Sequence, residues 1–278
     1  MTSTLERPPS TSPAPAARVL DPVRLVIGEA GEMAKFIGSV MRAIPDTRRF
    51  STEVVHQAGT IILSSGLIIW LMEWVMGDEC GLEASYTLKQ IGAPLYSGTF
   101  NAWCSVRVMA PYMWGYILAA KVGCGLVAEI GSMRISDEID AMEVMGIPSK
   151  TFLVATRVLA LWIAMPFLYI VGLGVMFVSE YVVTVAVLQG VSAGGYGYTF
   201  WGFQNPYDTL ASLTKIMTTG TAIVLVSCYF GYNARGGPVG VGIATAKSMM
   251  LNMILVHALN LFCTEVFWGL STNAPIAS

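Results

Sequence analysis

Charged side chains are scarce in this sequence. Asp, Glu, Lys and Arg make up 12% of the 278 residues, against about 25% in a typical soluble domain. Hydrophobic residues make up 54%. A soluble fold needs a charged surface, so this shortage indicates that lipid replaces water around much of the protein. The net charge of −2 provides no basic surface, and no nucleic-acid partner is predicted.

Residues that build metal sites and catalytic sites are also few. The two histidines, His56 and His257, stand alone and about 200 residues apart. The cysteines form no C-x-x-C pair, and four of the five lie in apolar runs, which is typical of free cysteines that act as small hydrophobic residues. Phosphate-loop, serine-hydrolase and metalloprotease motifs are all absent. The sequence therefore predicts no metal, no catalytic residue and no cofactor bound by this chain.

Long apolar segments are abundant instead, and five of them are each long enough to form a transmembrane helix of about 20 residues. Lys and Arg concentrate before the first segment and in the second and fourth connections, whereas connection 77–94 has a single Lys and connection 179–207 has neither residue. The positive-inside rule then predicts a cytoplasmic N-terminus and a C-terminus outside. The predicted spans are about 54–76, 95–121, 152–178, 208–231 and 249–270.

Two segments precede these spans. Residues 1–20 are rich in Pro, Ser, Thr and Ala, without the apolar core of a signal peptide, and predict a disordered tail. Asp21 and Pro22 are a typical helix start. Apolar residues then recur every three or four positions, with charges on the opposite face, which predicts an amphipathic helix over 21–50 in the headgroup layer. Residues 51–278 form the predicted all-α membrane domain.

Three ionisable residues, Glu73, Arg107 and Lys215, are predicted at membrane depth. An ionisable group there costs about 2.5–3.5 kcal/mol, so it usually faces the protein interior with a partner. Glu73 and Arg107 are predicted at similar heights towards the outer side. We therefore consider that they pair across the first two spans, or that Arg107 binds an anionic lipid headgroup. Snorkelling of both side chains to the outer interface is the alternative.

An acidic segment lies between the second and third spans. Five of the eighteen carboxylates fall within residues 129–148, and Ser136, an apolar stripe and Gly146 predict a short helix over about 135–146. The charge rule places this helix in the cytoplasm. It either lies passively at the membrane surface or docks in a groove of a soluble partner, whose movement it would pass to both spans. The stripe consists of Ile135, Ile139 and Met142.

The run from Lys121 to Pro148 resembles the signature of the MlaE/YrbE permease family, which is approximately A-E-(I/L)-G-x-M-R-x-(T/S)-E-Q-(I/L)-D-A-(L/M)-E-x-M. Here it reads A-E-I-G-S-M-R-I-S-D-E-I-D-A-M-E-V-M. The similarity extends over roughly residues 20–270 and includes a lysine early in the fourth span, matched by Lys215. One departure concerns Arg107, which lacks the glutamate that usually follows it in the family and for which Glu73 is one candidate partner.

The resemblance implies a permease subunit of an ABC-type MCE lipid transporter in a bacterial inner membrane. Two permeases, identical or different, would form the membrane core. A separate P-loop ATPase would hold ATP and Mg, and MCE-domain proteins would carry fatty acids, sterols, phospholipids or other envelope lipids. The alternatives are a non-transporting scaffold for the MCE assembly and a secondary transporter. The residues expected to meet the ATPase are Arg134, Asp137, Glu138, Ile139, Asp140, Met142 and Glu143.

Overall fold

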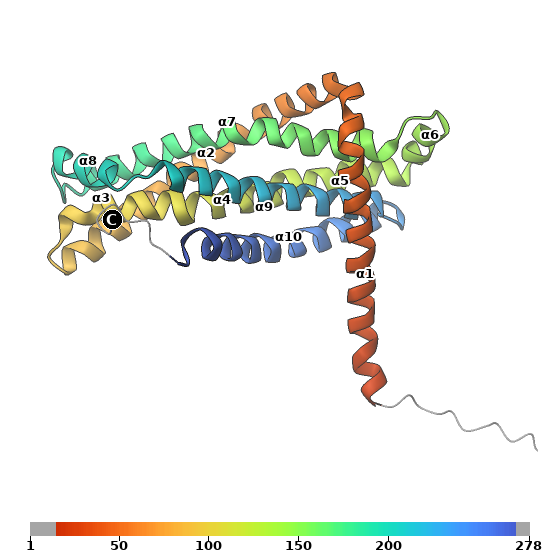
Figure 1. Cartoon of the computed structure of the whole chain (residues 1–278), viewed down its shortest axis with the longest axis horizontal. Helices are drawn as coiled ribbons and strands as arrows, with labels where there is room; N and C mark the ends of the chain where they lie inside the picture. Colours follow the sequence, from red (N-terminus) through yellow and green to blue (C-terminus); the bar gives the residue numbers. More distant parts are fainter. Residues whose placement is uncertain (1–14, 271–278) are drawn as a thin grey trace, which may run out of the picture.

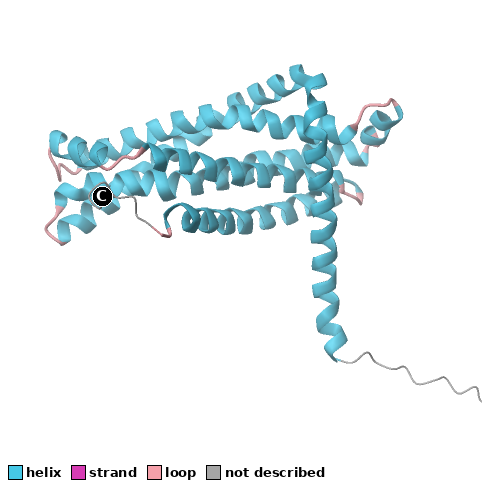
Figure 2. Ribbon diagram, viewed as in Figure 1, coloured by secondary structure: helices cyan, strands magenta, loops and turns pink. Residues whose placement is uncertain are grey.

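The computed structural model describes residues 15–270, and every regular element in that range is a helix (Figures 1 and 2). Five of its helical stretches are long and apolar enough to cross a membrane. The predicted all-α class with five spans is confirmed to that extent. The predicted tail falls mostly outside the described residues. The N-terminal helix α1 (Pro15–Ala43) begins six residues before the predicted start at Asp21.

The five spans differ in regularity. The first is the unbroken helix α2 (Ser51–Gln90), while the second and third alternate between α-helical and π-helical stretches. The second comprises α3 (Ser97–Trp103), η3 (Cys104–Met109), α4 (Ala110–Ile117), η4 (Leu118–Gly123) and α5 (Cys124–Ile135). The third comprises η5 (Thr151–Ala155), α7 (Thr156–Tyr181) and η6 (Val182–Val187), and the last two are α9 (Pro206–Tyr232) and α10 (Gly237–Trp268).

The short helices mark the two ends of this bundle. Helix α6 (Glu138–Val144) lies at one end, and helix α8 (Ala193–Gly202) lies at the other (Figure 1). A 3-10 turn, η2 (Pro94–Tyr96), lies at the α8 end, between the first two spans. A further 3-10 stretch, η1 (Ile44–Phe50), connects α1 to the first span.

Helix α1 crosses the bundle near its α6 end instead of running alongside the spans (Figure 1). Its Phe36 and Val40 are buried in the main core, whereas Ile27 is exposed. One stretch of the helix therefore packs against the spans, and the part towards its N-terminus projects beyond them. This arrangement fits a helix that lies along a membrane surface, which stays a prediction.

The connections at the α8 end are more helical than predicted. The interval 77–94 is mostly the continuation of α2 to Gln90, and 179–207 contains the end of α7, η6 and α8. At 1.5 Å per residue, α2 is about 60 Å long, roughly twice the hydrocarbon thickness of a bilayer. Charged residues after position 77 marked the end of the apolar stretch, but they do not break a helix. The helix that contains the first span is therefore several turns longer than the predicted span of 54–76.

Helices α2 and α7 run parallel and close together because glycines line their interface. Gly66 faces Leu168, Gly77 faces the backbone of Met176, and Gly81 faces Val183. Without side chains at these positions the two backbones approach closely, as is usual between helices in lipid.

A disulfide joins two of the five cysteines, of which Cys104 lies in an apolar run that favoured a free thiol. Cys80 of α2 is bonded to Cys104 at the start of η3. The two residues are 24 positions apart and in different spans, so the spacing of the cysteines in the sequence did not indicate that they pair. Cys124, Cys228 and Cys263 are free, as predicted.

Candidate functional site

The intramembrane Arg107 pairs with Asp208 and not with Glu73. Its Nε and Nη2 atoms both donate to Asp208 Oδ2, at 3.0 and 2.7 Å. Both side chains are nearly buried. Helix α9 places the carboxylate, because Asn205 caps the helix and Asp208 lies in its first turn, where the helix dipole favours negative charge.

Two tryptophans complete the surroundings of this ion pair. The indole N–H of Trp268 donates to Asp208 Oδ1 at 2.7 Å. The guanidinium of Arg107 lies 4.8 Å from the ring centre of Trp103 and 5.5 Å from that of Trp268. A charge-assisted hydrogen-bond pair with cation–π contacts of this kind holds both groups in one arrangement.

Lys215 lies in the same region, seven residues or about two turns after Asp208 on the same face of α9. Its Nζ donates to the backbone carbonyl of Arg107 at 2.8 Å and to Thr264 Oγ1 at 2.9 Å. In an α-helix the Arg107 carbonyl would accept from the N–H of residue 111, but that residue is proline and has no N–H. Lys215 therefore satisfies a carbonyl that Pro111 leaves without its helical donor.

A second carbonyl of the same π-helical stretch is satisfied in the same way. Ser212 Oγ donates to the carbonyl of Val106 at 2.6 Å. In a π-helix the partner of that carbonyl would again be residue 111. Helix α9 thus supplies two side-chain donors, Ser212 and Lys215, to the irregular segment that carries Arg107.

Glu73 lies elsewhere, between α2 and α7. Its side chain is fully buried, and both carboxyl oxygens lack a hydrogen-bond partner among the described residues. Its Cγ lies against Gly172 of α7. The hypothesis of a Glu73–Arg107 pair is therefore wrong. The similar predicted heights were no guide to which face of each helix the two side chains occupy.

A largely apolar cavity of about 400 Å³ opens beside Arg107. Arg107 is the one charged residue in its wall. The Nη1 atom of the guanidinium makes no hydrogen bond with the described residues, so one donor edge of the arginine remains available. The other wall residues are Phe100, Trp103, Cys104, Val108 and Met109.

A larger apolar groove, of about 610 Å³, runs along α9. Thr214, Thr218 and Thr221 follow each other at helical spacing on this face, and each hydroxyl donates to a backbone carbonyl of α9 itself. The threonines therefore present methyl groups to the groove. The rest of the wall comes from Ile37 of α1, Trp162 of α7, and Leu213, Met217, Ala222 and Leu225 of α9.

The acidic segment forms a shorter helix than predicted, with a different cap. Helix α5 continues to Ile135, and Ser136 donates back to the Ser132 carbonyl at 3.0 Å, so Ser136 ends α5 instead of starting α6. Asp137 adopts a left-handed conformation (φ 60°) at the turn between the two helices. The predicted stop is confirmed: Gly146 has a φ of 79°, and α6 ends at Val144.

The apolar stripe of α6 faces inward. Ile139 is fully buried in the main core and Met142 packs against it, so Ile139 offers a partner no surface, contrary to the expectation that it meets the ATPase. The exposed apolar residues come later: Val144 is 88% exposed and Met145 68%. Asp137, Glu138 and Asp140 are exposed beside them.

Among the predicted contact residues, Arg134, Asp140 and Glu143 form bonds within the chain itself. Glu143 accepts hydrogen bonds from Ser149 Oγ at 2.6 Å and from Tyr232 Oη at 3.0 Å. The hydrogen bonds from Ser149 and Tyr232 lower the pKa of the Glu143 carboxyl. Arg134 forms an exposed ion pair with Asp140 at 2.6 Å. Glu143 thus fastens α6 to the end of α9, and α6 is fixed at both sides.

Comparison with known proteins identifies the family of this chain. The model of the family described as Permease MlaE matches residues 54–266. The chain belongs to the MlaE permease family. It is therefore a permease of the ABC transporter class. Among residues 27–270, whose side chains the structure describes, no group of three or more His, Cys, Asp or Glu residues could hold a metal ion.

Relatives of this permease cover most of its length. A probable ABC transporter permease protein of Rickettsia conorii is 33% identical over 86% of this chain and 92% of its own. The intermembrane phospholipid transport system permease protein MlaE of Haemophilus influenzae is 26% identical over 87% of this chain and 92% of its own. The chloroplastic protein TRIGALACTOSYLDIACYLGLYCEROL 1 of Arabidopsis thaliana is 25% identical over 58% of this chain and 46% of its own.

Asp208 and Ser212 are the site residues that sequence reasoning missed. Asp208 stood at the predicted start of the fourth span, and nothing in the sequence assigned it a role. For Ser212 a signal was present, because Pro111 has no N–H and leaves backbone carbonyls about one turn earlier in need of a donor, but this signal does not point to the carboxylate of Asp208. Polar residues in a neighbouring span were the candidates for that donor.

Proposed function

We propose that this permease moves lipid between the inner membrane and a tunnel of MCE-domain proteins, as one of two permeases driven by a separate ATPase. Membership of the MlaE family supports this, as does the printed function of the Haemophilus influenzae relative, intermembrane phospholipid transport. Phospholipids are the first substrate class to test, and fatty acids and sterols are the next. The chain has no phosphate-binding loop, so ATP and Mg belong to the partner.

The observation that carries the proposal is the exposed helix α6, fixed between the second and third spans. Its buried Ile139 and the hydrogen bonds to Glu143 attach it to the spans. A force applied to α6 would therefore pass to the membrane helices, as coupling to an ATPase requires. The contact surface we propose comprises Asp137, Glu138, Asp140, Val144 and Met145, with Arg134 at its edge.

We place the lipid along two surfaces. The groove on α9 would take acyl chains, because its wall is apolar and its threonine hydroxyls are satisfied internally. The cavity beside Arg107 would take an anionic headgroup, which the free Nη1 edge of the guanidinium matches. A second permease, identical or different, would close the groove.

The α6 end is the cytoplasmic end in this proposal, and the C-terminus is outside. The distribution of Lys and Arg supports this orientation. The Cys80–Cys104 disulfide supports it independently, because disulfides persist in oxidising compartments and this one lies towards the α8 end of α2.

Reconstitution of the complex tests the proposal. The permease, its ATPase and its MCE proteins are placed in one population of vesicles, and transfer of a fluorescent phospholipid is followed with and without ATP. We expect transfer that requires ATP and this permease. Transfer that follows an ion gradient without ATP would favour a secondary transporter. ATP hydrolysis without any lipid transfer would favour a scaffold.

A further inference from the structure

The disulfide lies next to the ion pair. Cys104 is the first residue of the π-helical segment η3 (Cys104–Met109), and Arg107 is the fourth. Both line the 400 Å³ cavity. Since Cys80 belongs to α2, the bond attaches η3 covalently to the first span.

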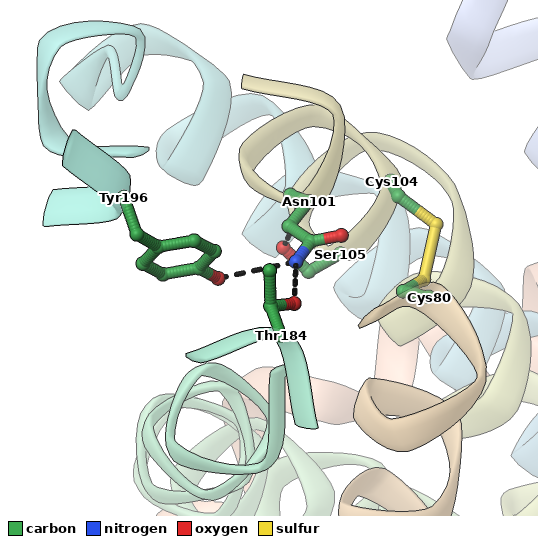
Figure 3. Close-up of a disulfide and its surroundings, with 6 residues drawn as sticks. All are labelled: Cys80, Asn101, Cys104, Ser105, Thr184 and Tyr196. Carbon is green, nitrogen blue, oxygen red and sulfur yellow. Dashed lines mark hydrogen bonds between the residues drawn. A yellow bond between two sulfur atoms is a disulfide. The ribbon is translucent and has the colours of Figure 1, made fainter. Parts of the chain in front are cut away.

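Hydrogen bonds attach the same helix to two further elements. Asn101, one turn before Cys104, donates through Nδ2 to Thr184 Oγ1 and to Tyr196 Oη, both at 3.2 Å. Figure 3 shows these contacts to the left of the disulfide. The helix that leads into the Arg107 segment is thus attached to α2 by the disulfide and to η6 and α8 by hydrogen bonds.

A π-helical segment needs such attachment more than an α-helix does. π-helices are rare, and they occur mostly as single-turn bulges inside α-helices, frequently at functional sites. In η3, two backbone carbonyls already depend on side chains of α9. Loss of the covalent link would leave η3 held by hydrogen bonds alone.

The two sulfur atoms differ in accessibility. Cys80 is 2% exposed, whereas Cys104 is half-buried and forms part of the cavity wall. Cys80 lies four residues beyond the predicted end of the first span at 76, about 6 Å along the helix. The bond is therefore near the outer membrane surface, where Cys104 can be attacked by a thiolate from the outer compartment.

We propose that the Cys80–Cys104 disulfide is a redox-sensitive brace that keeps η3, and with it Arg107, in the Asp208-bound arrangement, and that a thiol–disulfide oxidoreductase outside the membrane acts on it. This inference rests on the proposed function only for its transport measurement. In formation, the two thiols give up two protons and two electrons to the disulfide of the oxidoreductase, which becomes a dithiol. In reduction, a thiolate of the dithiol attacks Cys104 Sγ, Cys80 leaves as a thiolate, and the second thiol releases the oxidised oxidoreductase.

The redox state can be counted directly in the wild-type complex. Reconstituted vesicles are treated with dithiothreitol, quenched, denatured and labelled with a polyethylene-glycol maleimide. The permease has five cysteines, of which two form the disulfide, so the oxidised form binds three labels and the reduced form five. Three labels after treatment of the folded complex would overturn the claim that the bond is accessible.

Lipid transfer is measured on the same vesicles. We expect a fall of about threefold or more on reduction, within the range of changes that act through a packed element, and recovery with oxidised glutathione. The double variant C80A/C104A should transfer lipid slowly and ignore dithiothreitol, while the control variant C124A should behave as wild type. Five labels with unchanged transfer would overturn the brace.

A third measurement separates bracing of Arg107 from general weakening of the fold. If the bond acts through Arg107, reduction should have no further effect on transfer in an R107A background, since effects on one unit do not add. If reduction and R107A lower transfer additively, the disulfide does not act through Arg107. No transfer in the oxidised wild type would instead refute the proposed function, and the label count would still report on the bond.

Discussion

Arg107 and Asp208 are 101 residues apart in the sequence, yet two hydrogen bonds to a single carboxylate oxygen join them across two spans. The pair sits where the second span is π-helical and the fourth span begins. It therefore connects the least regular stretch of one helix to the rigid first turn of another. Several consequences of this relationship can be measured.

Breaking the pair should destabilise the permease strongly. D208N leaves a nearly buried guanidinium without its counter-charge, and removal of one partner of such a pair costs about 3–5 kcal/mol. Thermal unfolding in detergent should show a clearly lower midpoint. The exchanged variant R107D/D208R should recover part of the loss. Full stability of D208N would contradict the pairing, because there would be no loss for the exchanged variant to recover.

Glu73 provides the matched contrast. It is buried without a cation partner among the described residues. Replacing an unpaired buried ionisable group by an apolar one of similar size removes a desolvation penalty. We expect E73L to keep or raise the unfolding midpoint under the same conditions in which D208L lowers it. A large loss in E73L would indicate a partner for Glu73 supplied by the assembled complex.

Lys215 and Pro111 should be energetically coupled. K215M leaves the Arg107 carbonyl without its side-chain donor, which costs about 1–3 kcal/mol for a buried acceptor. P111A returns a backbone N–H at the position that an α-helix would use. The loss in K215M should therefore shrink in the P111A background. A double-mutant cycle of unfolding free energies with no coupling term would refute this explanation of Lys215.

The exposed end of α6 should govern capture of the ATPase. V144D/M145D places two charges where we propose apolar contact, and we expect affinity for the ATPase to fall about tenfold or more, equivalent to 1.4 kcal/mol. The variant should still insert and unfold normally, because both side chains are exposed. In contrast, I139D should lower stability, since its side chain is in the core. Unchanged co-purification of V144D/M145D would remove α6 as the coupling surface.

Glu143 should keep α6 fastened over a wide pH range. Hydrogen bonds from Ser149 and Tyr232 lower its pKa below the ordinary 4.5. A lowered pKa in the folded state means that this stabilisation is complete above pH 4.5 and disappears as the pH falls through the folded-state value. The hydrogen-exchange protection factors of residues 138–147, which correct for the intrinsic pH dependence of exchange, should therefore be constant from pH 8 to pH 5 and fall only in more acidic solution. In S149A this fall in protection should begin at higher pH.

The sequence predicted the elements of the fold better than their contacts. Apolar length and the placement of Lys and Arg are properties of single segments, so the five spans could be located. Partners depend on which face of one helix meets which face of another. The similar predicted heights of Glu73 and Arg107 suggested that these two residues pair. It is the packing of the spans that places Asp208 next to Arg107. The disulfide was not predicted for the same reason, because it joins cysteines of two different spans.

The acidic segment shows the same division between local and tertiary information. Gly146 and Pro148 ended the helix as predicted, because a left-handed glycine is a local requirement. The predicted start of the helix was wrong, since α5 extends to Ile135 and Ser136 caps the C-terminus of α5. The stripe was real, but the core of the permease occupies it, not a partner.

The π-helical stretches of the second and third spans carry a consequence for register. A π-bulge is an α-helix with one residue added, so deleting a single residue from 104–109 would return this stretch to regular α-helix and leave the residues after it on their present faces. The same deletion from a regular α-helix would turn everything after it by about 100° relative to everything before it. Alignments that allow no gap inside this helix will match the wrong residues in relatives that lack the bulge.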